Sequence, residues 1–282
     1  MKVLRSVLLV AGVLAALPAS AKPKHILISD SLLANADQWD VKRNDRWEGM
    51  NRWAFGDYAV VASKTGWTTG GTHTNLFKTK SESYSEQKFS FVMSNKTDSA
   101  FVDAAHQIVR QSNPGLKVGK DTHIGGTGQT VENDRFIASI SIGRDTTEMW
   151  DLLVGETEVT ERSFDREDLA RHTAVLIHAD RRIALVPVFS RKLDKKPSFG
   201  SMLAIGFHPP AMGYEFVEDG HSHCAVEYFS SGVSGQYKNT VWMNKTADPR
   251  LQLVLAAAMT SVLELKTQEI RYDPDDPNSP KR

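Results

Sequence analysis

The only cysteine of the chain lies beside two histidines. The stretch EDGHSHCAVEYF, residues 218–229, contains His221, His223 and Cys224. Imidazole nitrogens and thiolates are common zinc ligands, and a thiolate beside an imidazole can also act as a nucleophile. The spacing therefore suggests a metal site or a reactive cysteine, with one strand of a core as the plain alternative.

Alternation along a strand separates these side chains. Successive strand residues point to opposite faces, which places Cys224 with Val226 and His223 with His221. His223 and Cys224 could not share one ion, whereas His221 and His223 could bind zinc or copper together with Glu227 or His208. No HExxH or paired CxxC motif supplies further ligands. We predict a core strand without a cofactor, and the three histidines are the candidate metal ligands of the alternative.

The other motifs that could carry chemistry are incomplete. A hydrolase with a nucleophile elbow needs G-x-S-x-G, which neither FGSML around Ser201 nor GVSGQ around Ser234 matches. Trp47, Trp53 and Trp67 could line a carbohydrate-binding face, but core packing is the preferred interpretation. We therefore favour a non-catalytic protein over an enzyme.

The N-terminal segment has the pattern of a secretory signal. Lys2 and Arg5 precede an apolar run over residues 7–17, and small residues follow at Ala19 and Ala21. The apolar run is too short to span a bilayer. We expect residues 1–21 to be a cleaved signal peptide and the mature protein to be exported, either periplasmic or secreted.

The composition is that of a globular protein without a strong electrostatic preference. The chain of 282 residues is 40% hydrophobic and 24% charged, and its 34 basic residues balance 34 acidic ones. A neutral chain lacks the basic surface of proteins that bind nucleic acids or anionic lipids. A single cysteine cannot form an internal disulfide, so packing must provide the stability. As partner we expect a small ligand or a protein, with no nucleic acid and no membrane span.

Most of the chain predicts antiparallel strands. Apolar residues recur at every second position in FGDYAVVASK, EQKFSFVMSN and DRFIASISIG, which is the period of a strand with one buried face. AVLIHADRRIALVPVF and GYEFVEDGHSHCAVEYF each contain two such runs around a polar turn, as β-hairpins do. Short antiparallel strands therefore dominate the predicted fold.

Two segments predict helices. In the first, over residues 97–112, Thr97 is the candidate N-cap, and Phe101 and Ile108 belong to an apolar set at helical spacing. The second helix is the stronger prediction, because Asp248 before Pro249 is a helix start signal.

Nearly every residue of the second helix, from 251 to 265, is apolar or small. A helix that is apolar on every side must be enclosed. A membrane span is the competing interpretation, but the segment is short for a span and contains Gln252 and Glu264. We expect a central helix surrounded by sheet.

The domain organisation is simple. We expect one β-rich domain over residues 22–271 and a polar, proline-rich, disordered tail over residues 272–282. The similar stretches VMSNKT and VWMNKT each precede a predicted helix. They suggest a division of the domain into two strands-then-helix halves, residues 38–112 and 134–266, although chance similarity explains them equally well.

An antiparallel barrel that ends in an apolar helix after Asp248-Pro249 resembles the tubby, scramblase and LURP-one group, whose barrels enclose a C-terminal helix. This resemblance covers residues 240–270 and would imply lipid or protein binding. The whole chain also resembles a family of uncharacterised exported bacterial proteins with FGDY...GW near the start and VW...DP...LVLAAA near the end. Neither resemblance identifies functional residues.

The sequence thus predicts an exported, soluble α+β protein. Its core would be a mainly antiparallel β-sheet or barrel-like meander with a buried hydrophobic C-terminal helix. The favoured function is non-catalytic binding or an envelope-associated role. The alternative is a metal-dependent or hydrolytic enzyme that uses the histidines between residues 208 and 223.

Overall fold

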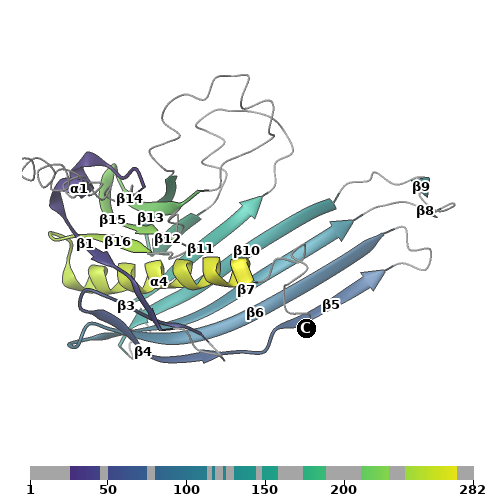
Figure 1. Cartoon of the computed structure of the whole chain (residues 1–282), viewed down its shortest axis with the longest axis horizontal. Helices are drawn as coiled ribbons and strands as arrows, with labels where there is room; N and C mark the ends of the chain where they lie inside the picture. The colour runs from purple at the N-terminus through teal and green to yellow at the C-terminus, as the bar shows by residue number, and fades with distance from the viewer. Residues whose placement is uncertain are drawn as a thin grey trace, which may run out of the picture.

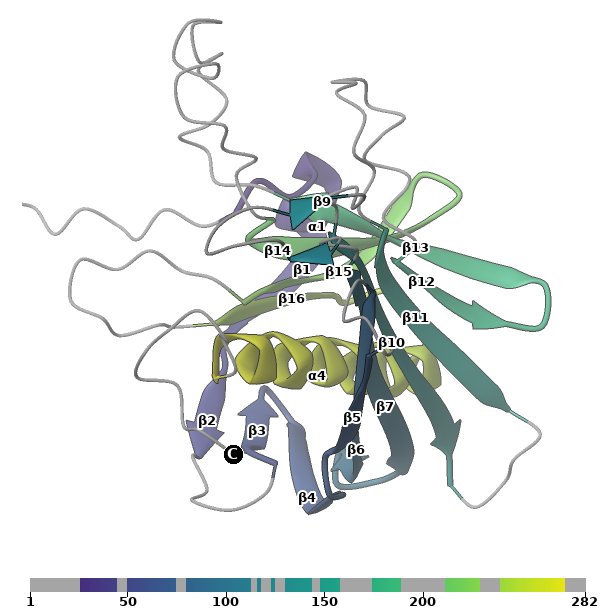
Figure 2. The same ribbon diagram turned by 90° about the vertical axis from the view of Figure 1, so that its right-hand side faces the viewer.

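A curved antiparallel sheet of fourteen strands surrounds one long helix in the computed structural model of the chain (Figures 1 and 2). A two-stranded hairpin, β8 (Leu116–Lys117) with β9 (His123–Ile124), is separate from this sheet. The structure describes residues 26–44, 50–74, 80–112, 116–117, 123–124, 130–143, 148–157, 174–188, 211–228 and 239–271. The predicted signal peptide and tail lie outside these ranges.

Neighbours in the sheet are mostly neighbours in the chain, and all pairs are antiparallel. β5 (Thr69–Thr74) pairs with β6 beside the main path. In sheet order the other strands are β1 (Ala36–Asp40), β16 (Thr240–Asn244), β15 (His221–Glu227), β14 (Gly213–Glu218), β13 (Arg181–Val188), β12 (Ala174–His178), β11 (Met149–Thr157), β10 (Thr130–Ile142), β7 (Ser99–Ser112), β6 (Ser81–Ser94), β4 (Tyr58–Thr65), β3 (Arg52–Phe55) and β2 (Lys42–Asn44).

The two ends of the sheet are joined by one residue. β1 lies at one end of the strand order and β2 at the other, and only Val41 separates them in the chain. The backbone N–H of Val41 donates to the carbonyl oxygen of Asn239 at 2.8 Å. Because so short a link holds the ends together, the sheet forms a nearly closed barrel.

Helix α4 (Pro249–Arg271) runs through this barrel (Figure 2). The backbone N–H groups of Arg250 and Leu251 donate to Oδ1 of Asp248 at 2.9 and 3.2 Å, which gives partners to N–H groups that have none inside the helix. Every side chain from 253 to 265 is buried. The enclosed helix and its start are therefore confirmed. None of the helices among the residues described has both the length and the apolar character that a membrane span needs.

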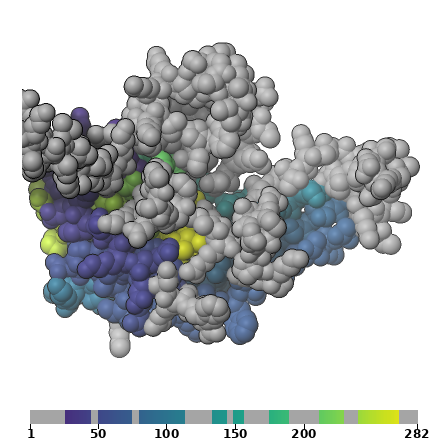
Figure 3. Space-filling model, viewed as in Figure 1, coloured from purple at the N-terminus to yellow at the C-terminus, as the bar shows by residue number. Residues whose placement is uncertain are grey.

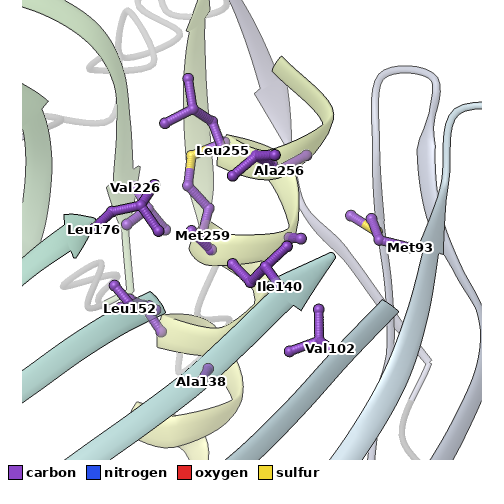
Figure 4. Packing of buried hydrophobic residues seen from close by; sticks show 14 of the residues in the cluster. Met93, Val102, Ala138, Ile140, Leu152, Leu176, Val226, Leu255, Ala256 and Met259 are labelled. Carbon is purple, nitrogen blue, oxygen red and sulfur yellow. The ribbon is translucent and has the colours of Figure 1, made fainter. Parts of the chain in front are cut away.

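The core fills the space between α4 and the surrounding strands. Figure 4 shows Leu255 and Met259 of α4 among Ile140 of β10, Leu152 of β11 and Val226 of β15. All five side chains are fully buried, and each such burial stabilises the fold by about 1.5–3 kcal/mol. The predicted alternation is confirmed by the buried residues Tyr58, Val60, Phe89, Phe91, Met93, Phe136, Ala138, Ile140 and Ile142.

Strand β15 is buried on both faces. Cys224 belongs to the main core, whereas the neighbouring Ala225 packs with Leu32 and Trp242 in a second apolar cluster. Leu32 belongs to the short helix α1 (Asp30–Asn35). The segment that includes α1 therefore covers β15 and β16 on the side of the sheet opposite α4.

The helix predicted over residues 97–112 is wrong, because β7 occupies Ser99–Ser112. Ala100, Val102 and Ala104 are buried at every second position, and β7 pairs with β6 and β10 along its whole length. The ladder on both sides overrides the helical propensity of the alanines. The first of the two suggested halves therefore contains no helix among its described residues.

The barrel-like antiparallel meander around a buried C-terminal helix is confirmed in the part of the chain that the structure describes. The term α+β fits only loosely, because sheet accounts for most of the ordered elements. Tertiary pairing has converted one predicted helix into a strand, and α4 is the only helix inside the barrel among the residues described.

Candidate functional site

Polar side chains gather near both ends of α4. We call Trp150, His178, Arg181, Glu218 and His223 the N-terminal cluster, because the charge of Asp248, the N-cap of α4, acts on Arg181. The second group lies on β6, β7 and β10, which continue past the C-terminal end of α4 (Figure 1). We call it the inner-face patch, and it consists of Ser83, Ser85, Gln87, His106, Arg110 and Asp134.

The N-terminal cluster joins strands β11 to β15 by hydrogen bonds and ring contacts. Arg181 donates from Nε to Oε1 of Glu218 at 2.9 Å and from Nη2 to Oε2 at 2.7 Å. His223 Nε2 lies 3.0 Å from the same Oε2. The Trp150 ring is stacked on the His178 ring with centroids 4.9 Å apart. Arg181 Cζ lies 5.2 Å from the centroid of the Trp150 ring. The cluster thus links five consecutive strands of the barrel.

The charges of this cluster satisfy one another. The hydrogen bond from Arg181 holds the pKa of the Glu218 carboxyl below its ordinary value, with desolvation as a smaller opposing effect. The same bond raises the pKa of the Arg181 guanidinium. A carboxylate that already accepts a bidentate arginine and an imidazole has little capacity left for a ligand. The arrangement therefore stabilises this end of the barrel.

The structure does not bring the candidate metal ligands together among the residues it describes. His221 is exposed, His223 is bound to Glu218, and His208 lies outside the described ranges. Across those ranges, His, Cys, Asp and Glu form no group of three or more that could hold a metal ion. The metal hypothesis thus stays a prediction, because one of its three candidate ligands, His208, is not described by the structure.

Cys224 is a core residue, as predicted. It is fully buried, and burial raises the pKa of its thiol well above 9.0, with the charge of Glu215 as a smaller cause. Such a thiol does not ionise at neutral pH, so the reactive-cysteine hypothesis receives no support. Simple alternation does not describe the whole of β15, because the register shifts between Phe216 and Val217 and leaves His223 as the extra residue of a bulge.

Two buried carboxylates tie separate elements together. Oε2 of Glu264 on α4 accepts from Trp53 Nε1 at 2.9 Å and Asn51 Nδ2 at 3.3 Å, next to β3. On β14, Glu215 accepts the Ser222 hydroxyl at 2.6 Å and the backbone N–H that precedes α1. Neutral donors balance the desolvation of each carboxylate. Both groups are structural, and the sequence pattern pointed to neither.

The inner-face patch continues the core face of three long strands. Directly opposite residues share one face of a sheet, and Gln87, His106 and Phe136 form one such row, with Phe136 in the core. Two residues further along, Ser85 and Asp134 lie on the same face, with the half-buried Ile108 between them. Figure 3 shows blue atoms of these strands projecting beyond the yellow atoms of α4. Apart from Ile108, the face thus changes from apolar to polar where the helix ends.

One hydrogen-bonded pair marks this change. His106 Nε2 lies 2.6 Å from Asp134 Oδ1, and His106 is only 6% exposed because it packs edge-on against Phe136. Ser83, Ser85, Gln87 and Arg110 beyond it are half-buried. Among the described residues, the hydrogen-bond partner of His106 is Asp134. Hydroxyl, amide and guanidinium groups on a rigid sheet are suited to bind a polar ligand.

The tryptophan prediction is correct for one residue and wrong for another. Trp53 is fully buried, as expected of core packing. Trp67 is 93% exposed, because it lies in the connection between β4 and β5 at an edge of the sheet. Trp47 lies outside the described residues.

Comparisons of the chain with protein-family models, curated proteins and solved structures found no match. The resemblance to the tubby, scramblase and LURP-one group therefore stays a prediction.

Proposed function

We propose that the protein is an exported, non-catalytic binding protein that holds a polar ligand on the inner-face patch. The observation that carries this proposal is the change along one continuous face of β6, β7 and β10. The face packs against α4 through apolar residues and then, except for Ile108, presents polar side chains where the helix ends. A strand that served only to complete the core would have no need to extend beyond it.

The type of side chain supports binding rather than catalysis. Gln87 and Arg110 provide hydrogen-bond donors, and Ser83 and Ser85 can both donate and accept. Their backbones belong to a ladder that is regular from Ser81 to Ser94. Because the strands fix the spacing of these groups, a ligand would meet a preorganised set of partners. Export is supported by the signal pattern of residues 1–21 and is part of the same proposal.

The test is native mass spectrometry of the full chain, expressed with its own signal and purified from the cell-envelope fraction. We expect the wild type to carry a compound that the double variant Gln87→Ala, Arg110→Ala has lost. The matched control is Gln107→Ala with Gln111→Ala, two exposed residues on the outer face of the same strand β7. The control should retain the compound.

Two results would contradict the proposal. A wild type without any bound compound, or equal retention by the inner-face and outer-face variants, would remove the patch as a binding site. Recovery of the compound in a chemically altered form after incubation with the protein would favour an enzyme instead.

A further inference from the structure

Strand β5 is an edge strand with an open side. It pairs with β6 at residues 81–86, whereas β4 pairs with the same side of β6 further along and ends at Thr65. Within the ranges described, nothing pairs with the other side of β5. An edge of this kind presents a row of backbone N–H and C=O groups that another strand can bind.

This edge lacks the features that usually prevent pairing. Natural edge strands carry lysines, prolines or bulges, but β5 has the sequence TGGTHT and a continuous register with β6. Its only ionisable side chain is His73. No charged side chain that is always ionised, no proline and no bulge in the strand therefore opposes the approach of a second strand.

Two exposed aromatic side chains flank the edge. The ring of Tyr84 lies across Gly71, where an added Cβ would be 3.0 Å from the ring, and it remains 52% exposed. Trp67, just before β5, is almost fully exposed. Aromatic side chains of this kind are the usual anchors of protein interfaces.

We propose that β5 pairs antiparallel with β5 of a second copy of the chain. A strand without Asp, Glu, Lys or Arg brings no like charges together when it pairs with itself. The same backbone groups face each other across a two-fold axis, which makes the contact self-complementary. In this pairing Trp67 of each copy lies beside the Thr74 end of the other β5.

The symmetry has a consequence for the inner-face patch. Antiparallel strands that are neighbours across a two-fold axis have that axis perpendicular to the sheet, so both copies turn the same face to the same side. The patches of the two copies then lie on one continuous sheet. A continuous surface formed by both patches favours a ligand long enough to cross both copies. This statement about the ligand rests on the proposed function, whereas the pairing of the two β5 strands does not.

The first test is sedimentation velocity of the mature wild-type protein over a hundredfold range of concentration. We expect a dimer that the double variant Thr69→Lys, His73→Lys converts to a monomer. Both lysines would lie directly opposite glutamates of β6, Glu86 and Glu82, so the fold should be retained. Circular dichroism and the thermal midpoint check that it is.

The matched control is Gln107→Lys with Gln111→Lys, which puts the same charges on the outer face of β7, away from the edge. This variant should remain a dimer. A wild type that is monomeric at every concentration would overturn the proposal, as would a dimer that the β5 lysines leave unchanged.

A cross-link locates the contact. Thr72→Cys near the middle of β5 should be joined between copies by a short bis-maleimide, whereas Arg182→Cys on β13 should not. The native Cys224 is fully buried and does not compete. A dimer without the Thr72 cross-link would place the interface elsewhere and overturn the β5 pairing. Neither measurement involves the ligand, so failure here is distinguishable from failure of the proposed function.

Discussion

At the N-terminal end of α4, Glu218 accepts hydrogen bonds from Arg181 and contacts His223, and the rings of Trp150 and His178 are stacked beside them. Beyond the C-terminal end of α4, similar chemical groups lie along strands β6, β7 and β10. There only His106 is as well buried as a core residue, and the rest of the inner-face patch stays half-exposed. The two regions use the same kinds of side chain in different ways.

Under the proposed function, the relation between polar groups matters more than their type. A cluster whose charges saturate one another stabilises the elements that contribute to it. A set of half-buried donors and acceptors on a rigid sheet can form hydrogen bonds to a ligand. We therefore expect substitutions at the N-terminal cluster to change stability, and substitutions in the patch to change binding.

The largest loss of stability should come from substitutions in α4, the helix that lies between the two regions. Ala257→Asp would bury a charge without a partner and should prevent folding. Leu255→Ala would leave a cavity and lower the free energy of unfolding by about 2–5 kcal/mol. Urea midpoints for a scan of positions 253–259 provide the measurement. Free acceptance of Asp on one side of the helix would contradict an enclosed α4.

The next effect concerns the N-terminal cluster. Glu218→Gln removes the charge that Arg181 and His223 share. Because the Arg181 side chain is 45% exposed and solvent screens the pair, the free energy of unfolding at pH 7 should fall by about 0.5–1.5 kcal/mol. The control is Glu86→Gln, whose partner Lys88 is mostly exposed, with an expected loss below about 0.5 kcal/mol. Equal losses would show that the cluster is no more than a surface ion pair.

The same variant has a predicted pH dependence. Arg181 lowers the pKa of Glu218 below 4.5, so its stabilising effect is present above pH 4.5 and is lost as the pH falls through the folded-state pKa. Urea midpoints of the wild type and Glu218→Gln should therefore converge in acid. A difference between them that stays constant down to pH 3 would contradict this assignment.

The prediction for Cys224 concerns the rate at which thiol reagents label it at neutral pH. Because burial raises the pKa of its thiol well above 9.0, thiol reagents should label it slowly in the native state and quickly in denaturant. The raised pKa also means that its contribution to stability is complete below pH 9 and decreases as the pH rises further. Rapid labelling of the native protein would show that the site is open.

The smallest stability effect belongs to the inner-face patch. Gln87→Ala removes a half-buried side chain at the end of the core face. The free energy of unfolding, measured by urea denaturation, should change by less than about 0.5 kcal/mol. The same variant should retain less bound compound than the wild type. A large loss of stability would place Gln87 with the structural residues and would weaken the contrast between the two ends.

Local patterns were enough to predict the barrel and its central helix, because alternation and an all-round apolar helix report burial directly. They failed for β7. Its buried Ala100, Val102 and Ala104 are small, and its outward Phe101 and Ala105 gave a helical spacing, so only pairing with β6 and β10 decides its structure.

The candidate site could not be predicted for a related reason. His106 and Asp134 are 28 residues apart in sequence and meet only because of the register between β7 and β10. The bulge at His223 likewise depends on the pairing of β14 with β15. The sequence pattern pointed to the histidines near residue 221, where the structure places a turn and a structural cluster.

Hydrogen–deuterium exchange of the full chain, with and without the compound recovered from the envelope fraction, tests the contrast between the two ends most directly. If the inner-face patch binds the compound, exchange should slow in peptides that cover residues 81–87 and 107–112 of β6 and β7. Peptides that contain His178, Arg181 and residues 218–223 should be unchanged. Slower exchange at the N-terminal cluster, with none in the patch, would contradict the account.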